Sequence, residues 1–246
     1  MTTFTTPALV IRRADYSDYD RMVTLFAPEL GRIDAIARGC RRPKSPLVNA
    51  VEPFTSGEFT LYTHKERFTL KQCLISDSYY ELRGDYVRLS HGAYWLRLLD
   101  TVILPDTPSP ELFITTLRAL AHLNYGELPP ELVTFAFEAH FMRLMGLAPR
   151  MNACMLCMKP IASDARFDAD LGGAVCLECR SQAPYLSNGA RRILMKLPQT
   201  QFDRFQLLNG RPEWPEAAAH MRRYVNLRIH ADRFAPPLFE PAVDEK

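Results

Sequence analysis

Two pairs of cysteines constrain the fold of this chain more than any other feature of its sequence. Cys154 pairs with Cys157 and Cys176 with Cys179, each as C-x2-C, and eighteen residues separate the pairs. This is the spacing of four-cysteine zinc sites, in which each turn brings two thiolates to one side of a tetrahedral ion. Four free or redox-active thiols are the alternative. Because two such pairs rarely occur at this separation by chance, we expect one structural zinc ion per chain.

The residues between the two pairs fit a segment that folds around a metal ion. Gly172 and Gly173, just before the second pair, allow the chain to bend close to the ion. Residues 163–170 are polar and hold too few apolar side chains to fold by burial alone. The other two cysteines stand alone, and we expect Cys40 to be a loop thiol and Cys73 a buried residue of a strand.

The first third of the chain has the pattern of short β-strands separated by polar turns. The expected strands cover residues 8–13, 21–27, 32–38, 58–63 and 68–75. Five strands of this length make a small Greek-key barrel, and a barrel of this kind is typical of the OB-fold. We therefore assign residues 1–80 to an N-terminal OB-fold domain.

Basic residues gather at the third expected strand and in the loop that follows it. The net charge of the whole chain is only +2, so the charge has to be examined segment by segment. Between residues 32 and 44 one acid, Asp34, faces five cations: Arg32, Arg38, Arg41, Arg42 and Lys44. Charge alone would allow a solvated edge that keeps the barrel soluble. On a small barrel, however, such a surface is suited to holding a nucleic-acid backbone.

Four other cations of the barrel are weaker candidates for the same surface. Arg12 and Arg13 end the first expected strand, where an ordinary role at a sheet edge is equally compatible with the sequence. Lys65 and Lys71 belong to the last hairpin, where Glu66 reduces the local charge.

Several aromatic and imidazole side chains have two possible roles. Tyr16, Tyr19 and Tyr62 could stack on bases, but tyrosines of turns and strands commonly pack with only the hydroxyl exposed. His122 and His140 lie in apolar helical segments, so we expect them to be packed side chains rather than catalytic bases.

From about residue 85 the apolar residues recur with a helical period. The expected helices cover residues 85–104, 109–124, 129–145, 189–197 and 215–229. The third is apolar nearly all round and should form the centre of a helical domain. The prediction is a multidomain α+β protein, with a helical domain in two parts, 81–150 and 183–246, around a zinc module at 151–182. The tail from residue 236 is expected to be frayed.

Composition and missing motifs exclude several classes of protein. The sequence contains no run of the ~18–20 apolar residues that a membrane span needs, and residues 1–7 do not resemble a secretion signal. We therefore expect a cytoplasmic protein with no membrane partner. It lacks the phosphate-binding, dinucleotide-binding, H-E-x-x-H and G-x-S-x-G motifs, so we expect no enzymatic activity.

Three segments near the N-terminus together resemble the RecO family of bacterial recombinational repair proteins. They are residues 16–26 (YSDYDRMVTLF), 31–39 (GRIDAIARG) and 41–45 (RRPKS). The two cysteine pairs, with Leu171-Gly172-Gly173 between them, resemble the zinc module of that family. The resemblance therefore runs in the correct order from Ala8 to about Tyr185.

The departures from the family pattern are small. Asp18 stands where the family usually has Glu, Ala27 where it usually has Thr, and Arg38 where Lys is common. None of these changes alters the sign of a charge. After Tyr185 the chain matches the family only in general character.

The resemblance implies an OB-fold, a helical domain and a zinc module that act together as a recombination mediator. Such a protein binds single- and double-stranded DNA and anneals complementary strands. It would work with RecR, and with the single-stranded DNA-binding protein, to help RecA onto coated DNA. The alternative is a zinc-ribbon adaptor for protein–protein contact in which the barrel is only a scaffold.

Overall fold

The structure is a computed structural model that describes residues 2–65 and 67–230. It divides into two compact units, residues 1–114 and residues 115–246, which we describe separately. The barrel-containing unit thus extends well past residue 80 and includes a complete helix. The expected frayed tail lies outside the described residues.

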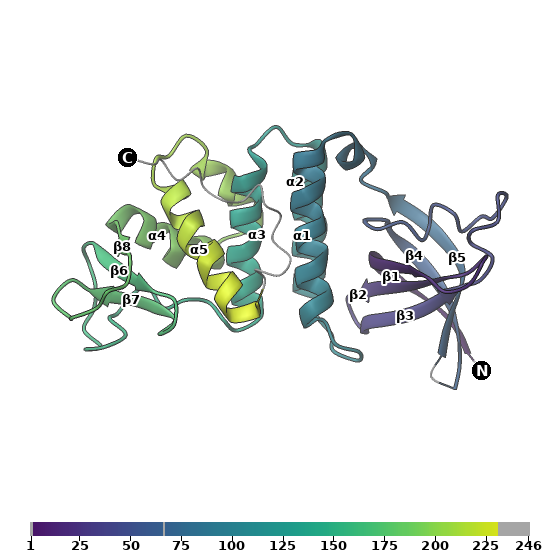
Figure 1. The fold of residues 1–246 in the computed structure, drawn as a ribbon, viewed down its shortest axis with the longest axis horizontal. Coiled ribbons are helices and arrows are strands. Elements are labelled where there is room, and N and C mark those ends of the chain that lie inside the picture. The colour runs from purple at the N-terminus through teal and green to yellow at the C-terminus, as the bar shows by residue number, and fades with distance from the viewer. Residues whose placement is uncertain (1, 66, 231–246) are drawn as a thin grey trace. The chain divides into compact units, whose positions relative to one another are not determined.

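Five strands of the first unit form a closed barrel (Figure 1). They are β1 (Thr2–Asp15), β2 (Arg21–Ala27), β3 (Gly31–Ala37), β4 (Ser56–His64) and β5 (Arg67–Asp77). Their order in the barrel is β1-β2-β3-β5-β4, and only the pairing of β3 with β5 is parallel. The five expected strands are confirmed, although β1 begins six residues earlier than expected. Its first residues pair with β4, from Thr2 opposite Thr63 to Pro7 opposite Glu58.

The barrel interior follows the alternation of the strands. Ile33, Ala35 and Ala37 of β3 are buried, and Asp34 on the opposite face is exposed, as the sequence predicts. The connection between β3 and β4 also contributes to this core, through Cys40, Leu47, Ala50 and Val51. All four are buried among the inward-facing residues of the strands. The sequence alone did not show that this loop is partly buried.

Helices complete the first unit. A short 3-10 helix, η1 (Tyr80–Gly84), leads into α1 (Tyr86–Val102), which contacts β1. Asp85 caps α1, since its side chain accepts a hydrogen bond from the backbone N–H of Arg88. The first turn of α2 (Pro110–Tyr125) also belongs to this unit, and Phe113 packs edge-on against Phe26 of β2.

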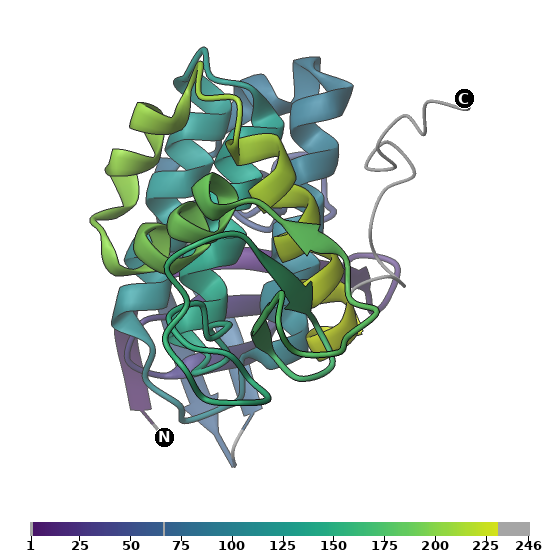
Figure 2. The ribbon, with the colours of Figure 1, turned by 90° about the vertical axis from the view of Figure 1, so that its left-hand side faces the viewer.

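The second unit is built around α3 (Pro130–Leu144), in which every residue from Leu132 to Met142 is buried. This confirms the expected central helix. The remaining helices are α4 (Asn188–Lys196), the 3-10 helices η2 (Leu197–Gln199) and η3 (Phe202–Leu208), and α5 (Trp214–Ile229). A small sheet of β6 (Ala165–Asp168), β7 (Gly173–Cys176) and β8 (Tyr185–Leu186) lies beside α4 and α5 (Figure 2). None of the helices that the structure describes has the length and hydropathy required to span a bilayer.

Gly31 lies where the start of β3 packs closely against the chain that follows α1, and this close packing can be tested. Its φ is +66°, and a Cβ atom at this position would lie 2.2 Å from the carbonyl oxygen of Leu104. We predict that Gly31→Ala destabilises the protein by about 2–4 kcal/mol, because both the left-handed backbone and the clash with a main-chain atom oppose a side chain. Thermal unfolding of the purified variant measures this.

Gly84→Ala is the matched control. Gly84 does not have a positive φ, and a Cβ atom there would meet nothing within 4 Å. The midpoint of thermal unfolding should therefore stay close to that of the parent protein. Equal midpoints for the two variants would contradict the assignment of Gly31 as a position that requires glycine.

Candidate metal centre and nucleic-acid interface

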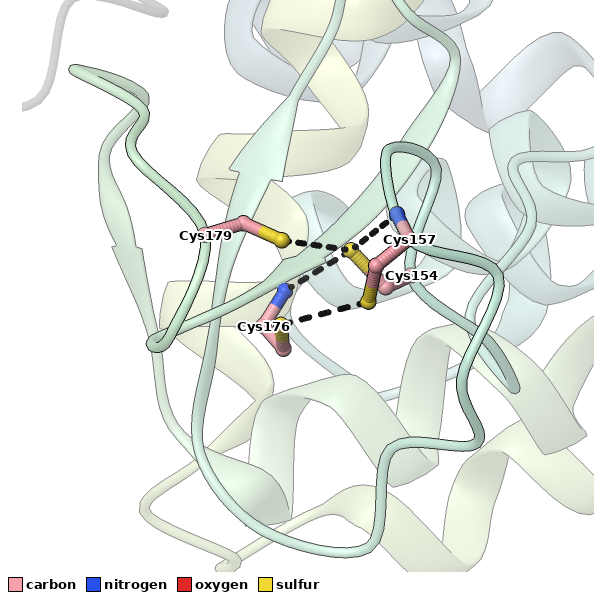
Figure 3. A group of neighbouring side chains, drawn as sticks. All are labelled: Cys154, Cys157, Cys176 and Cys179. Carbon is pink, nitrogen blue, oxygen red and sulfur yellow. Dashed lines mark hydrogen bonds between the residues drawn. The ribbon is translucent and has the colours of Figure 1, made fainter.

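The four paired cysteines converge on one point in the second unit (Figure 3). Cys154 and Cys157 come from a loop that follows α3, Cys176 ends β7, and Cys179 lies in the turn after it. The sheet produces this convergence, because pairing of β6 with β7 returns the chain to the first cysteine loop. The backbone N–H of Met155 also donates a hydrogen bond to the carbonyl oxygen of Ala174, which ties that loop to β7.

The distances between the sulfur atoms fit a tetrahedral ion. The four Sγ atoms lie within 4.8 Å of one another, with 3.9 Å between Cys154 and Cys179 and 3.8 Å between Cys157 and Cys176. Four sulfurs at about 2.3 Å from a central zinc ion would be about 3.8 Å apart. A disulfide would require about 2.05 Å. The donor set and its spacing therefore suit a four-coordinate metal ion.

Backbone amides prepare one of these sulfurs to be a thiolate. Burial opposes ionisation of Cys154, but its Sγ accepts hydrogen bonds from the backbone N–H groups of Cys157, Cys176 and Leu156. Together they lower the pKa of Cys154 to about 6. Without a cation the neighbouring sulfurs raise the pKa of Cys179 to about 12. A divalent ion at the centre would lower the pKa of the cysteines in the cluster, since it stabilises all four thiolates.

The side chain of Arg191, in α4, holds the first cysteine loop in place. Its buried guanidinium donates hydrogen bonds to the carbonyl oxygen of Met151, at 2.7 Å, and to that of Ser163, at 3.1 Å. These two carbonyls lie on either side of the first cysteine pair in sequence. One side chain therefore fixes both ends of the loop to a helix.

A second set of contacts joins the small sheet to α5. Phe167 of β6 packs against the rings of His220 and Tyr224, and the His220 ring hydrogen bonds to the carbonyl oxygen of Tyr185. The cysteine module is thus attached to both C-terminal helices, although its own segment is short and polar.

The two cysteines outside the cluster are buried to different degrees. Cys40 lies in a loop, as expected, but is fully buried against the barrel core, and burial raises the pKa of its thiol. Cys73 is partly buried on β5, where burial and then the charge of Glu58 raise its pKa to about 11. Neither thiol is disposed to ionise.

At the barrel, two loops far apart in sequence meet at the same end. The backbone N–H of Arg41 donates to the carbonyl oxygen of Tyr19, and the backbone N–H of Gly39 donates to the side chain of Asp20 at 2.7 Å. The Arg41 guanidinium also reaches the carbonyl oxygen of Ser17. These bonds hold the β1–β2 turn against the start of the β3–β4 loop.

The predicted basic residues of this region divide into two groups. Arg38, Arg42 and Lys44 are exposed, and they form no ion pair with any residue that the structure describes. Arg42 lies over the ring of Tyr19, 5.2 Å from its centroid. Arg41 is half-exposed and forms an ion pair with Asp15, so it is partly occupied in holding the two loops together.

Three other predicted arginines are engaged in ion pairs within the first unit. Arg32 binds Asp34 of its own strand and Asp100 of α1, with 2.7 Å between its nitrogen and the Asp100 carboxylate. Burial lowers the pKa of Arg32, but its bonds to Asp34 and then to Asp100 outweigh burial and raise it. Arg12 shares Asp100, at 3.5 Å, and Arg13 pairs with Glu52. The outward face that sequence assigned to Arg32 is correct, but α1 covers its guanidinium.

The two lysines of the last hairpin are exposed. Lys65 lies in the turn between β4 and β5 with a φ of +49°. Lys71 lies on β5, with its Nζ atom 5.2 Å from the centroid of the Tyr62 ring. Sequence reasoning considered these residues separately and did not identify the pairing of Lys71 with Tyr62.

The two helix histidines are packed side chains, as expected. His140 is buried, and its ring nitrogens lie near the carbonyl oxygens of Ala136 and Thr200. His122 contacts Asp203 at 2.9 Å and packs against Phe205.

Two sequence models of protein families match this chain, one for each part of it. The model described as "Recombination protein O N terminal" matches residues 1–79, and the model described as "Recombination protein O C terminal" matches residues 83–233. The two matches follow each other without overlap and cover nearly the whole sequence.

Curated relatives agree with these models. The "DNA repair protein RecO" of Anaeromyxobacter sp. (strain K) is 31% identical over 237 residues, which cover 92% of this chain and 93% of the relative. The protein of the same name from Moorella thermoacetica is 34% identical over 179 residues, which are 72% of this chain but only 66% of the relative. With both family models and relatives of this similarity in agreement, the chain belongs to the RecO family of DNA repair proteins.

Proposed function

We propose that this protein is a recombination mediator that binds single- and double-stranded DNA and anneals complementary strands. The observation that carries the proposal is a group of cations at one end of the barrel that have no ion-pair partner within residues 2–65 and 67–230, namely Arg38, Arg42 and Lys44. Phosphate contacts supply most of the sequence-independent affinity for DNA. Annealing requires the same contacts, because two backbones must be held together against their mutual repulsion.

The barrel fits an OB-fold in this role. Its strand order, with β1 between β2 and β4 and with β3 parallel to β5, is that of a closed five-stranded Greek-key barrel. Folds of this kind bind nucleic-acid strands by combining a basic groove with aromatic side chains. The barrel of this chain offers both kinds of side chain at one end.

Family membership and the names of the relatives support a role in DNA repair. Within that role we propose that the protein acts with RecR to help load RecA onto DNA coated by the single-stranded DNA-binding protein. It would do so in the cytoplasm, at the nucleoid, and without catalysing a covalent reaction.

We further propose that Cys154, Cys157, Cys176 and Cys179 hold one structural zinc ion. The spacing of the sulfurs and the amides directed at Cys154 support this assignment. Four protein ligands would leave no position for water or substrate, so the ion would stabilise the fold of the second unit.

A zinc-ribbon adaptor remains the competing function. Exposed apolar side chains on the two cysteine turns favour it, since Leu156, Met158 and Leu177 are each about half exposed. On that alternative the barrel would be a scaffold and the protein would not bind an oligonucleotide at low salt.

DNA binding is tested by the salt dependence of affinity. We predict that Arg38→Ala, Arg42→Ala and Lys44→Ala combined lower the slope of log affinity against log salt by about 2, since each lost contact with a single strand removes about 0.7. All sequences should be weakened alike. Titration of labelled oligonucleotides at several salt concentrations measures the slope.

Arg12→Ala is the control for this experiment, because Arg12 is an exposed cation of the same barrel that is paired with Asp100. The slope of log affinity against log salt should be the same for this variant as for the parent protein. A triple variant with the parental slope and the parental thermal midpoint would remove this surface from the proposal, and absence of any binding by the parent would favour the adaptor.

The metal assignment predicts one zinc ion per chain in protein purified without added metal. Cys176→Ser should lose the ion and lower the thermal stability of the second unit, because metal binding contributes directly to folding in such a module. Elemental analysis and thermal unfolding measure the two effects.

Cys73→Ser supplies the matched control, since Cys73 is a thiol of the barrel outside the cluster. It should retain a full complement of zinc. Parent protein that contains no zinc and four titratable thiols at the cluster would rule the site out.

A further inference from the structure

Two tyrosines of the barrel surface are each paired with a cation. The guanidinium of Arg42 lies over Tyr19, and the ammonium of Lys71 lies over Tyr62, each 5.2 Å from the ring centroid. Tyr19 is 54% exposed, and Tyr62 lies on the outer face of β4, between the inward-facing Leu61 and the partly exposed Thr63. A base could stack only on the ring face that the cation does not occupy.

The strand register places these two pairs on one continuous surface. Tyr62 of β4 is opposite Thr69 of β5, and Thr69 is in turn opposite Ile36 of β3. Ile36 is in turn opposite Met22 of β2, three residues after Tyr19. Arg38 directly follows the last residue of β3 and is exposed. A cation with no ion-pair partner among the described residues thus stands at the end of the strand that lies between β2 and β5.

Hydrogen bonds fix the first of these pairs. The carbonyl oxygen of Tyr19 accepts the backbone N–H of Arg41, and the backbone N–H of Arg42 donates to the carbonyl oxygen of Gly39. Gly39 has a φ of +65°, which produces the sharp turn after β3. Tyr19 and Arg42 are thus held beside each other by backbone contacts rather than by their side chains alone.

The second pair depends on an irregularity in β5. In the pairing of β4 with β5, Leu61 is opposite Leu70 and Thr60 is opposite Gln72, so Lys71 is an extra residue at a β-bulge. A bulge re-aims a side chain locally. Here it allows Lys71 to lie over Tyr62, on the outer face of the barrel.

Both tyrosines belong to the same closed five-stranded barrel. Tyr19 lies in the turn that leads into β2, and Tyr62 lies near the end of β4; in the closed barrel these two strands are separated by β3 and β5 on one side and by β1 on the other. One OB-fold binds roughly 4–16 nucleotides.

We propose that Tyr19 and Tyr62 are two stacking sites for unpaired bases of single-stranded DNA, with Arg38 holding the phosphates between them. This inference rests on the proposed DNA-binding function and adds to it the basis of a preference for single strands. In a duplex the base faces are covered by their neighbours, so only the cations would act. In a single strand the bases can turn toward the tyrosine rings.

The test compares three ligands of equal length: a single strand, a duplex, and a strand of abasic residues that has phosphates but no bases. Tyr19→Ala and Tyr62→Ala should each weaken single-strand binding by roughly 5- to 150-fold, the range for loss of one base–aromatic stack. Affinity for the duplex and for the abasic strand should change less than twofold. The double variant should bind single and abasic strands about equally.

Conservative and matched variants separate stacking from structure. Tyr19→Phe and Tyr62→Phe retain a π face and should bind like the parent, whereas Tyr19→Leu and Tyr62→Leu retain apolar bulk and should bind like the alanine variants. Tyr80→Ala is the control, because Tyr80 is 70% exposed and carries Arg83 over its ring, but lies on η1 outside the strands. It should leave all three affinities unchanged.

Failure of this inference would differ from failure of the proposed function. If the alanine and leucine variants bound the single strand as the parent does, or lost affinity for all three ligands equally, the stacking sites would be overturned while cation-dependent binding persisted. If the parent bound none of the ligands, the DNA-binding function itself would be wrong.

Discussion

The parallel pairing of β3 with β5 is the contact on which the first unit depends. It closes five strands into a barrel, and closure leaves the sheet without a long free edge. The register of this pairing also fixes where β3 ends relative to β5, and therefore where the basic loop begins. The loop then adds Leu47, Ala50 and Val51 to the barrel core, while its cations remain at the surface. Core packing and the exposed charge thus come from a single connection.

Sequence patterns predicted the local elements well because each has a strong period. Every expected strand and helix is present, and the alternation along β3 assigned its two faces correctly. Sequence could not predict which arginines remain unpaired. Arg32 and Asp100 are 68 residues apart, and no local pattern indicates that they meet. Charge density located the basic region, but tertiary contacts decided which of its members are available.

For the cysteine module, too, the sequence predicted the ligands but not the residues that support them. Spacing alone identified the four sulfurs that converge. It did not indicate the small sheet, since residues 165–168 are too short and too polar to be recognised as a strand without β7 beside them. Nor did it indicate Arg191, a charged residue that sequence would place on a surface but that lies buried against two backbone carbonyls. A ligand pattern can be found locally, whereas the support of a metal site is a long-range property.

Asp100 has a consequence for the surface charge of the barrel. Its one carboxylate is shared by Arg12 and Arg32, so it neutralises charge at two strands at once. The two guanidiniums that it holds form a reserve of positive charge on the barrel, separate from the exposed cations that follow β3. Loss of this single acid would release that reserve and enlarge the basic surface without adding any arginine. Evolution could therefore adjust the affinity of such a barrel for a polyanion from a helix position that never touches it.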